Sequence, residues 1–262
     1  MKTDKIILTL SGLLITLLLS GQGINQTDQS GKKQGEWRKL WPNGKVQYEG
    51  RFKNNLPVGK MIRYYESGVL QSVMEFTEDG SSAVATLYHP NGRIGARGNY
   101  SVQKKDGPWL FYSSEAEGYL VLQENYNMNV LNGQAIKYYR DSTVAETINW
   151  ENGIKHGEWK QFYENGVPAL QAFYVNGKLD GPFRTFKKSG SPDFTGAYKE
   201  NLRDGLWVIH NDDGSVKSQL EYSLGQITDP EYYQRETEYF DLLEKNKGKI
   251  ADPAETGTLI WK

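Results

Sequence analysis

The sequence predicts an all-β repeat fold: an elongated, twisted, single-layer antiparallel sheet of about eight β-hairpin units, with a C-terminal capping α-helix. Three features predict this fold. Glycines recur every 24 residues, aromatic residues recur at fixed offsets from those glycines, and each unit contains two turn motifs. A fixed period of this length is typical of a repeat protein, not of a globular enzyme with one core.

Seven marker glycines set the phase of the repeat. They are Gly35, Gly59, Gly107, Gly133, Gly157, Gly181 and Gly205. Between Gly59 and Gly107 two periods pass, and Ala83 stands where the missing marker would fall. The unit that starts at Gly107 carries two extra residues near Ser113 to Gly118. Eight units therefore occupy residues 35–228, and we number them one to eight along the chain.

Each unit is predicted to form one β-hairpin, because two columns of residues rich in aromatic side chains alternate with turn motifs. The column two positions after the marker is Trp37, Met61, Ala85, Trp109, Ala135, Trp159, Phe183 and Trp207. The column seventeen positions after it, allowing for the insertion, is Phe52, Phe76, Tyr100, Tyr126, Trp150, Tyr174, Tyr198 and Tyr222. Aromatic and β-branched runs favour strands. Asn-Gly and Asp-Gly pairs such as Asn165-Gly166 and Asp213-Gly214 favour tight turns, and we interpret their aspartates as turn residues without a catalytic role.

Single hairpins of this size are marginally stable in water, so the units are expected to stack and share their aromatic packing. With strands about 4.8 Å apart, eight units span about 75 Å. One point stays open. The columns two and five positions after the marker differ by an odd number, so either both faces of the sheet carry aromatic residues or a β-bulge brings the two columns together.

The repeat unit resembles the MORN repeat in its bacterial variant, which reads roughly Gly-x-Trp-x-x-Tyr-Tyr-x-x-Gly, a spacer and then aromatic-x-x-Gly. The clearest example runs from Gly157 to Gly166 and continues at Tyr174 to Gly177. The resemblance departs from that pattern at Ala83, at Ala135 and near Glu115, where weaker or distorted units are expected. It implies a hairpin-repeat sheet used as an interaction surface. Bacterial proteins of this kind are often labelled antitoxin components, others are associated with membranes or assembly scaffolds, and the family has no shared catalytic residues.

The N-terminal segment, residues 1–23, is expected to be a signal peptide. Lys2 and Lys5 precede an apolar run of 14 residues, and the small residues Gly21 and Gly23 follow it. The run is shorter than the roughly 20 residues of a membrane-spanning helix, which favours cleavage near Gly23 over an uncleaved anchor. No cysteine follows for a lipoprotein anchor. Residues 24–34 are expected to form a polar linker.

A C-terminal α-helix is expected at residues 229–248, followed by a flexible tail at 249–262. Asp229, Pro230 and Glu231 form a helix-start signal, and aromatic residues such as Tyr232 and Phe240 recur on one face. We interpret this helix as a cap on the open edge of the last unit, with a partner-binding helix as the alternative.

Composition and motifs give no sign of catalysis, so the chain is expected not to be an enzyme and to need no cofactor or metal. It has 31 basic and 32 acidic residues, which offers no broad attraction to nucleic acid or anionic lipid. Cysteine is absent. His89, His156 and His210 lie in different units and at different unit positions, which does not suit a shared metal site.

These features favour an exported, non-enzymatic scaffold that binds a protein partner in the bacterial cell envelope, in the periplasm or outside the cell. The alternatives are an antitoxin-like protein that neutralises a toxin by direct binding, and a surface module that binds glycan or lipid. A membrane contact is expected only through an uncleaved N-terminal segment. Exposed tyrosine and tryptophan suit a binding surface. The candidate partner-binding aromatics are Trp41, Tyr65, Tyr139, Trp159, Tyr163 and Trp207.

Overall fold

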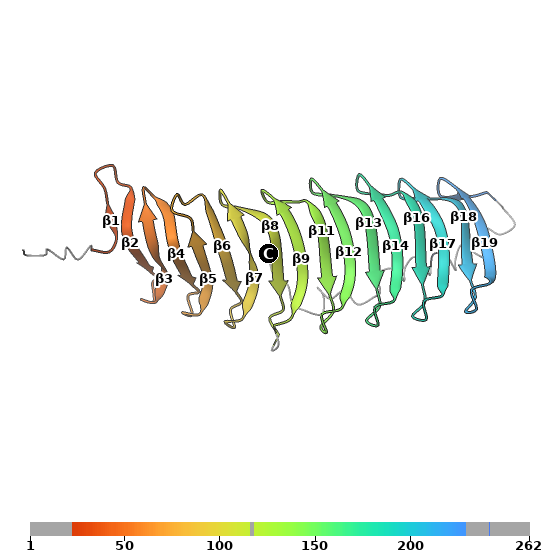
Figure 1. The fold of residues 1–262 in the computed structure, drawn as a ribbon, viewed down its shortest axis with the longest axis horizontal. Coiled ribbons are helices and arrows are strands. Elements are labelled where there is room, and N and C mark those ends of the chain that lie inside the picture. The colour runs from red at the N-terminus through yellow and green to blue at the C-terminus, as the bar shows by residue number, and fades with distance from the viewer. Residues whose placement is uncertain (1–22, 116–117, 229–240, 242–262) are drawn as a thin grey trace, which may run out of the picture.

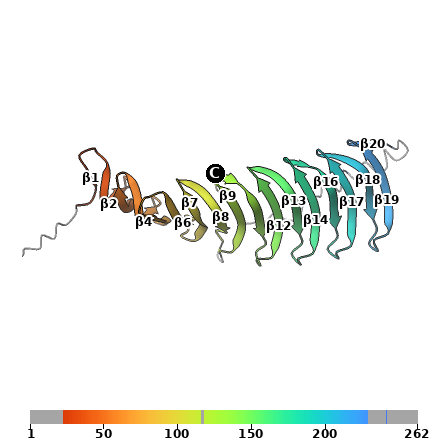
Figure 2. The ribbon, with the colours of Figure 1, turned by 45° about the horizontal axis from the view of Figure 1, so that its top comes forward.

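The protein is a long, single-layer antiparallel sheet of 20 strands that twists along its length (Figures 1 and 2). The computed structural model describes residues 23–115, 118–228 and 241. Within these residues each hairpin unit follows the previous one along the ribbon, so chain order and spatial order agree. The predicted all-β repeat sheet is confirmed.

Twenty strands make up the sheet. They are β1 (Gln26–Thr27), β2 (Lys33–Leu40), β3 (Val46–Lys53), β4 (Leu56–Tyr64), β5 (Leu70–Phe76), β6 (Ser82–Tyr88), β7 (Ile94–Ser101), β8 (Lys104–Tyr112), β9 (Leu120–Asn127), β10 (Val130–Leu131), β11 (Gly133–Tyr138), β12 (Val144–Glu151), β13 (Ile154–Phe162), β14 (Pro168–Val175), β15 (Lys178–Leu179), β16 (Gly181–Phe186), β17 (Pro192–Lys199), β18 (Leu202–His210), β19 (Val216–Ser223) and β20 (Gln226–Ile227). In two units the first strand of the hairpin is interrupted. The consecutive segments β10 and β11, and likewise β15 and β16, take the place that the continuous strand β13 has in unit six. The range expected as a linker contains β1, which pairs with the start of β2.

Both faces of the sheet carry aromatic residues, which resolves the point that the sequence left open. Trp159, two positions after its marker, pairs with Ala172, whereas Phe162, at position five, pairs with Pro168. The bulge lies in the partner strand, so Trp159 and Phe162 keep the alternation of their own strand and face opposite sides.

A second irregularity lies at the marker glycines. In β12 and β13 the register shifts between Ile148 and Trp150 as the chain passes Gly157, whose φ of 94° is in the left-handed region that favours glycine. Ala83 does not have a positive φ. The strands β5 and β6 pair without any register shift, and Phe76 stands directly opposite Ala83. Unit three therefore has a longer turn in place of a bulge, and the expected distortion at Ala83 is found.

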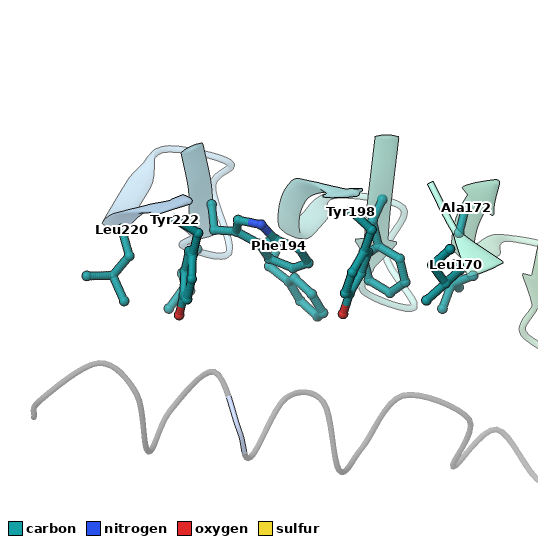
Figure 3. Close-up of a cluster of buried hydrophobic side chains, with 10 residues drawn as sticks. Leu170, Ala172, Phe194, Tyr198, Leu220 and Tyr222 are labelled. Atoms are coloured by element: carbon teal, nitrogen blue, oxygen red, sulfur yellow. The ribbon is translucent and has the colours of Figure 1, made fainter. Parts of the chain in front are cut away.

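Two hydrophobic clusters of buried residues lie on one side of the sheet. The larger cluster, over β14–β19, contains Leu170, Ala172, Leu179, Phe183, Phe194, Tyr198, Trp207, Ile209, Leu220 and Tyr222 (Figure 3). The smaller cluster contains Ala85, Ala96, Trp109, Phe111 and Val121. Each tryptophan of these clusters lies flat over a glycine of the neighbouring strand. A Cβ built on Gly196 would come within 2.3 Å of Cδ2 of Trp207, and a Cβ built on Gly98 would come equally close to Cδ2 of Trp109.

The fold prediction is wrong in one part: the C-terminal capping α-helix expected at residues 229–248 is not seen. The elements of the described residues are all β-strands. Apart from Asp241, that range lies outside the described residues, as do residues 1–22 and 249–262. A helix-start signal and an apolar spacing are local features, and they carry no information about packing on the last unit. The last hairpin is instead extended by β20, where Ile227 pairs with Tyr222.

Within the described part of the chain no helix has the length and hydrophobicity to cross a lipid bilayer.

Candidate functional site

One side of the sheet, which we call the aromatic face, carries the columns two and seventeen positions after the markers. Trp159 pairs with Ile148 and Ala172 on its two neighbouring strands, and directly paired residues of antiparallel strands point to the same side. The same pairing continues through Trp109 and its partner Glu124. This side also contains both buried clusters, so it is the packed side of the ribbon.

Basic side chains cover the rings of this face in several units. They come from the residue two positions before the marker. Lys33 Nζ lies 4.6 Å from the ring centre of Trp37, and Lys105 Nζ lies 4.7 Å from that of Trp109. Burial lowers the pKa of Lys105, and the nearby Glu124 carboxylate opposes this shift. Arg203 repeats the arrangement over Trp207 at 5.3 Å. Each contact is a cation–π interaction in which the basic side chain covers an aromatic ring of its own unit.

Four of the six candidate partner-binding aromatics tie neighbouring units together. Trp41, Tyr65, Tyr139 and Tyr163 all lie six positions after their markers. Trp41 Nε1 donates a hydrogen bond of 3.2 Å to a backbone carbonyl of the next unit, and the hydroxyls of Tyr65, Tyr139 and Tyr163 do the same at 2.7 Å. The acceptor is always the residue five positions after the next marker. These polar groups are therefore used inside the repeat array.

Two further residues of this column, which were not among the predicted candidates, bond to the next unit in the same way. The buried His89 occupies the same unit position, and its Nε2 lies 2.9 Å from the carbonyl oxygen of Tyr112. Lys187 Nζ also donates to a carbonyl one unit ahead, that of His210, at 3.3 Å. The six residues of the column that bond to the next unit share a polar group at the end of a long side chain. That property is visible in the sequence once the column is read for hydrogen-bond donors as well as for aromatic rings.

The other two candidates belong to the packed side. Trp207 is 0% exposed, and its Nε1 donates to the carbonyl of Ala197 at 3.1 Å. It is a core residue and offers no surface to a partner in this fold. Trp159 is half-buried, and its Nε1 donates to Glu146 Oε1 at 2.7 Å. The structure thus spreads the six candidates along the sheet and brings none of them into a common site.

The carboxylates at the centre of the aromatic face are also engaged. Besides Trp159, Glu146 accepts a hydrogen bond from Gln161 at 3.2 Å and forms an ion pair with Lys137 at 2.9 Å. The Tyr126 hydroxyl donates to Glu124 Oε2 at 2.5 Å, and burial together with this carboxylate raises the pKa of the tyrosine. Among the described residues, no group of three or more His, Cys, Asp or Glu residues is placed to hold a metal ion.

A hollow of about 300 Å³ opens on the aromatic face around unit two, which is within the size range of ligand pockets. Small residues of unit three, Gly80, Ser81, Ser82 and Ala83, form one wall of it. By sequence position Ser81 corresponds to Lys33 and Lys105, which cover aromatic rings in their own units, but Ser81 lies in the longer turn before β6 and has a short side chain. The lining residues are Phe52, Pro57, Met61, Arg63, Met74, Phe76, Gly80, Ser81, Ser82, Ala83, Tyr100 and Gln103.

Arg63 is the only charged residue among those that line the hollow, and Lys39 lies two strands away from it on the same face. Lys39 and Arg63 are exposed, and they pair across the sheet with Tyr48. Among the paired residues of β2–β7 on this face there is no aspartate or glutamate, and the acidic side chains Glu49 and Glu75 lie on the opposite face. The hollow therefore combines an apolar floor with a positive rim. We take it as the candidate site.

Three segments of the chain match a known repeat family. Residues 33–54, 57–78 and 155–176 match the MORN repeat variant. Each match begins two positions before a marker glycine, so it includes the position of the covering side chain. No curated protein matches the chain. One solved structure that matches is the crystal structure of GtfA/B complex bound to UDP and GlcNAc, with 17% identity over 49% of this chain and a TM-score of 0.21. This chain spans 24% of that one.

Proposed function

We propose that the chain is an exported, non-enzymatic repeat scaffold that binds a protein partner in the bacterial cell envelope. The observation that carries this proposal is the open hollow around unit two, whose apolar floor includes Phe76 and Met74 and whose rim includes the exposed Arg63. Apolar floors with a polar rim are typical of protein contacts. The proposal of export rests on the sequence of residues 1–23.

Glycan binding by ring stacking is less well supported by the geometry. A sugar ring needs the free face of a tryptophan or tyrosine. Trp109 and Trp207 are 0% exposed, and a lysine side chain lies over Trp37. We therefore propose protein contact ahead of sugar contact.

Site-specific photo-crosslinking in bacteria tests the proposal. A photoreactive residue is placed at Ser81, which is exposed at the hollow, and in a matched control at Thr86, which pairs with Val73 on the opposite face. We expect a crosslinked envelope protein from position 81 and not from position 86. The proposal of a partner at this site fails when position 81 gives no crosslinked protein or when both positions give the same products.

Cell fractionation tests the proposal of export. The expected result is a product in the envelope fraction, shortened by the signal segment. A full-length product that stays in the cytoplasm contradicts export and favours the antitoxin-like alternative, because a cytoplasmic antitoxin needs no export signal.

A further inference from the structure

The hollow lies where unit three lacks the long side chain that covers the aromatic rings in other units. In unit four, Lys105 lies over the rings of Trp109 and Tyr126, at 4.7 and 4.8 Å from their centres. In unit three the residue two positions before the marker position is Ser81, whose side chain is too short to cover a ring, and the hollow opens there beside Tyr100 and Phe76. A single large apolar side chain from a partner can occupy that space and restore the packing that the other units have.

The charge around the hollow indicates which charge a partner should carry. Lys39 and Arg63 have no carboxylate within ion-pair distance among the residues that the structure describes. Asp79, in the turn next to the hollow, accepts hydrogen bonds from Thr77 and Ser81 within that turn, and these bonds lower the pKa of Asp79 to about 2. Asp79 therefore stays ionised, but among the described residues it forms no ion pair with Lys39 or Arg63. These two exposed cations are available to a partner, and complementary potentials favour an acidic one.

The backbone of the sheet selects the partner's secondary structure. On the face of the sheet the backbone groups of β3–β7 are used in the ladders between strands, so a partner strand cannot add there. A helix contacts a face through side chains alone. Two strands advance the sheet by about 9.6 Å per unit, and seven residues advance an α-helix by about 10.5 Å. One helix face with an apolar residue at every seventh position therefore meets one unit per heptad.

We infer that the hollow and its basic rim bind an acidic amphipathic α-helix of the partner protein, which lies across the strands of units one to three with one apolar side chain in the hollow. This inference rests on the proposed function, because it names the chemistry of the partner at that site.

Fluorescence anisotropy of synthetic helices tests the inference with the folded chain. The probe is a labelled helix of about three heptads, about 30 Å long, with leucine on one face and glutamate beside it. One control peptide has lysine in place of each glutamate. A second has a central proline, which breaks the helix. We expect the acidic helix to bind about tenfold more tightly than either control.

Two protein variants with the same change of charge locate the contact. The rim variant, Lys39→Glu/Arg63→Glu, reverses the charge of Arg63 at the hollow and of Lys39, which lies two strands away on the same face. The control Arg51→Glu/Lys60→Glu reverses two exposed cations on the opposite face of units one and two. The rim variant is expected to lose about tenfold in affinity for the acidic helix and to prefer the lysine helix, whereas the control keeps the original preference. A third variant, Ser81→Trp, fills the hollow and is expected to weaken binding of the acidic helix about tenfold.

Three results overturn the inference: equal binding of the acidic and basic helices, equal effects of the two charge reversals, or binding to phosphatidylserine vesicles with no binding of the acidic helix. Circular dichroism confirms that each variant is folded. The proposed function has a separate test, because an envelope protein that still crosslinks at Ser81 in the rim variant supports a scaffold while it contradicts a helical acidic partner.

Discussion

Replacing Gly196 by alanine is predicted to destabilise the C-terminal units, although glycine is usually the weaker residue inside a strand. The new Cβ would come within 2.3 to 2.7 Å of three ring atoms of Trp207. The ring cannot move away freely, because it is 0% exposed and packs against Phe194 and Tyr198 at centroid distances of 5.8 and 5.1 Å. Overpacking of this kind costs about 1–3 kcal/mol.

A shift of the Trp207 ring would also weaken its hydrogen bond to the carbonyl of Ala197, which is 3.1 Å long in the structure. A typical hydrogen bond contributes about 1 kcal/mol. The expected loss of unfolding free energy for Gly196→Ala is therefore about 2–4 kcal/mol. Without the ring, alanine in place of glycine stabilises by about 0.4–1 kcal/mol. The sign of the change thus separates the two cases.

The measurement is urea unfolding followed by far-ultraviolet circular dichroism, with hydrogen exchange of β17 and β18 to locate the effect, because repeat proteins can unfold in parts. The control is the double variant Gly196→Ala/Trp207→Leu compared with Trp207→Leu alone. In that background the alanine should stabilise the protein by up to about 1 kcal/mol, since the clash is removed. An unchanged or raised urea midpoint for Gly196→Ala in the natural background would refute the argument that the ring needs the glycine.

Three further predictions concern the turns and the ties between units. Tyr163→Phe removes a hydrogen bond of 2.7 Å to the next unit and should lower the unfolding free energy by about 0.5–1.5 kcal/mol; Tyr88→Phe, at a hydroxyl with no hydrogen bond among the described residues, is the control, and equal effects on the urea midpoint would contradict the tie. Val102 has a φ of 47°, which is strained for a β-branched residue, and its side chain is 63% exposed. Val102→Asn should therefore raise the unfolding free energy by about 1 kcal/mol, measured by urea unfolding. A lowered urea midpoint would contradict this relief of strain. Burial raises the pKa of Tyr139 to about 12, above the 10.0 of a free tyrosine, so the unfolded chain loses this proton first as the pH rises and stability should fall between pH 10 and 12; thermal unfolding should show a smaller slope over this window for Tyr139→Phe, and an unchanged slope would count against the assignment.

The sequence was sufficient to predict the hairpins, their number and their order, because the turn residues and the 24-residue period are local features. It was also sufficient to locate the irregular unit at Ala83. It could not show that the irregularity produces a hollow, because that depends on Phe76 pairing directly with Ala83 and on which side chain then covers the ring of Tyr100.

The roles of the candidate aromatics could not be predicted for a related reason. A tyrosine at a hairpin turn looks exposed when one unit is considered alone. Tyr65, Tyr139 and Tyr163 receive their hydrogen-bond acceptor from the following unit, and that neighbour exists only in the stacked array. The prediction of a C-terminal capping helix was wrong because local helix signals do not determine what the last unit packs against.

The ties from position six give the ribbon a direction. Trp41 reaches to Tyr64, Tyr139 to Phe162 and Lys187 to His210, so in each case the donor is synthesised before its acceptor. During synthesis, each completed hairpin already carries the donor that bonds to the hairpin emerging next. Docking of a new hairpin therefore needs only the unit made just before it. The repeat array can thus fold unit by unit during translation, from its N-terminal hairpin to its C-terminal one.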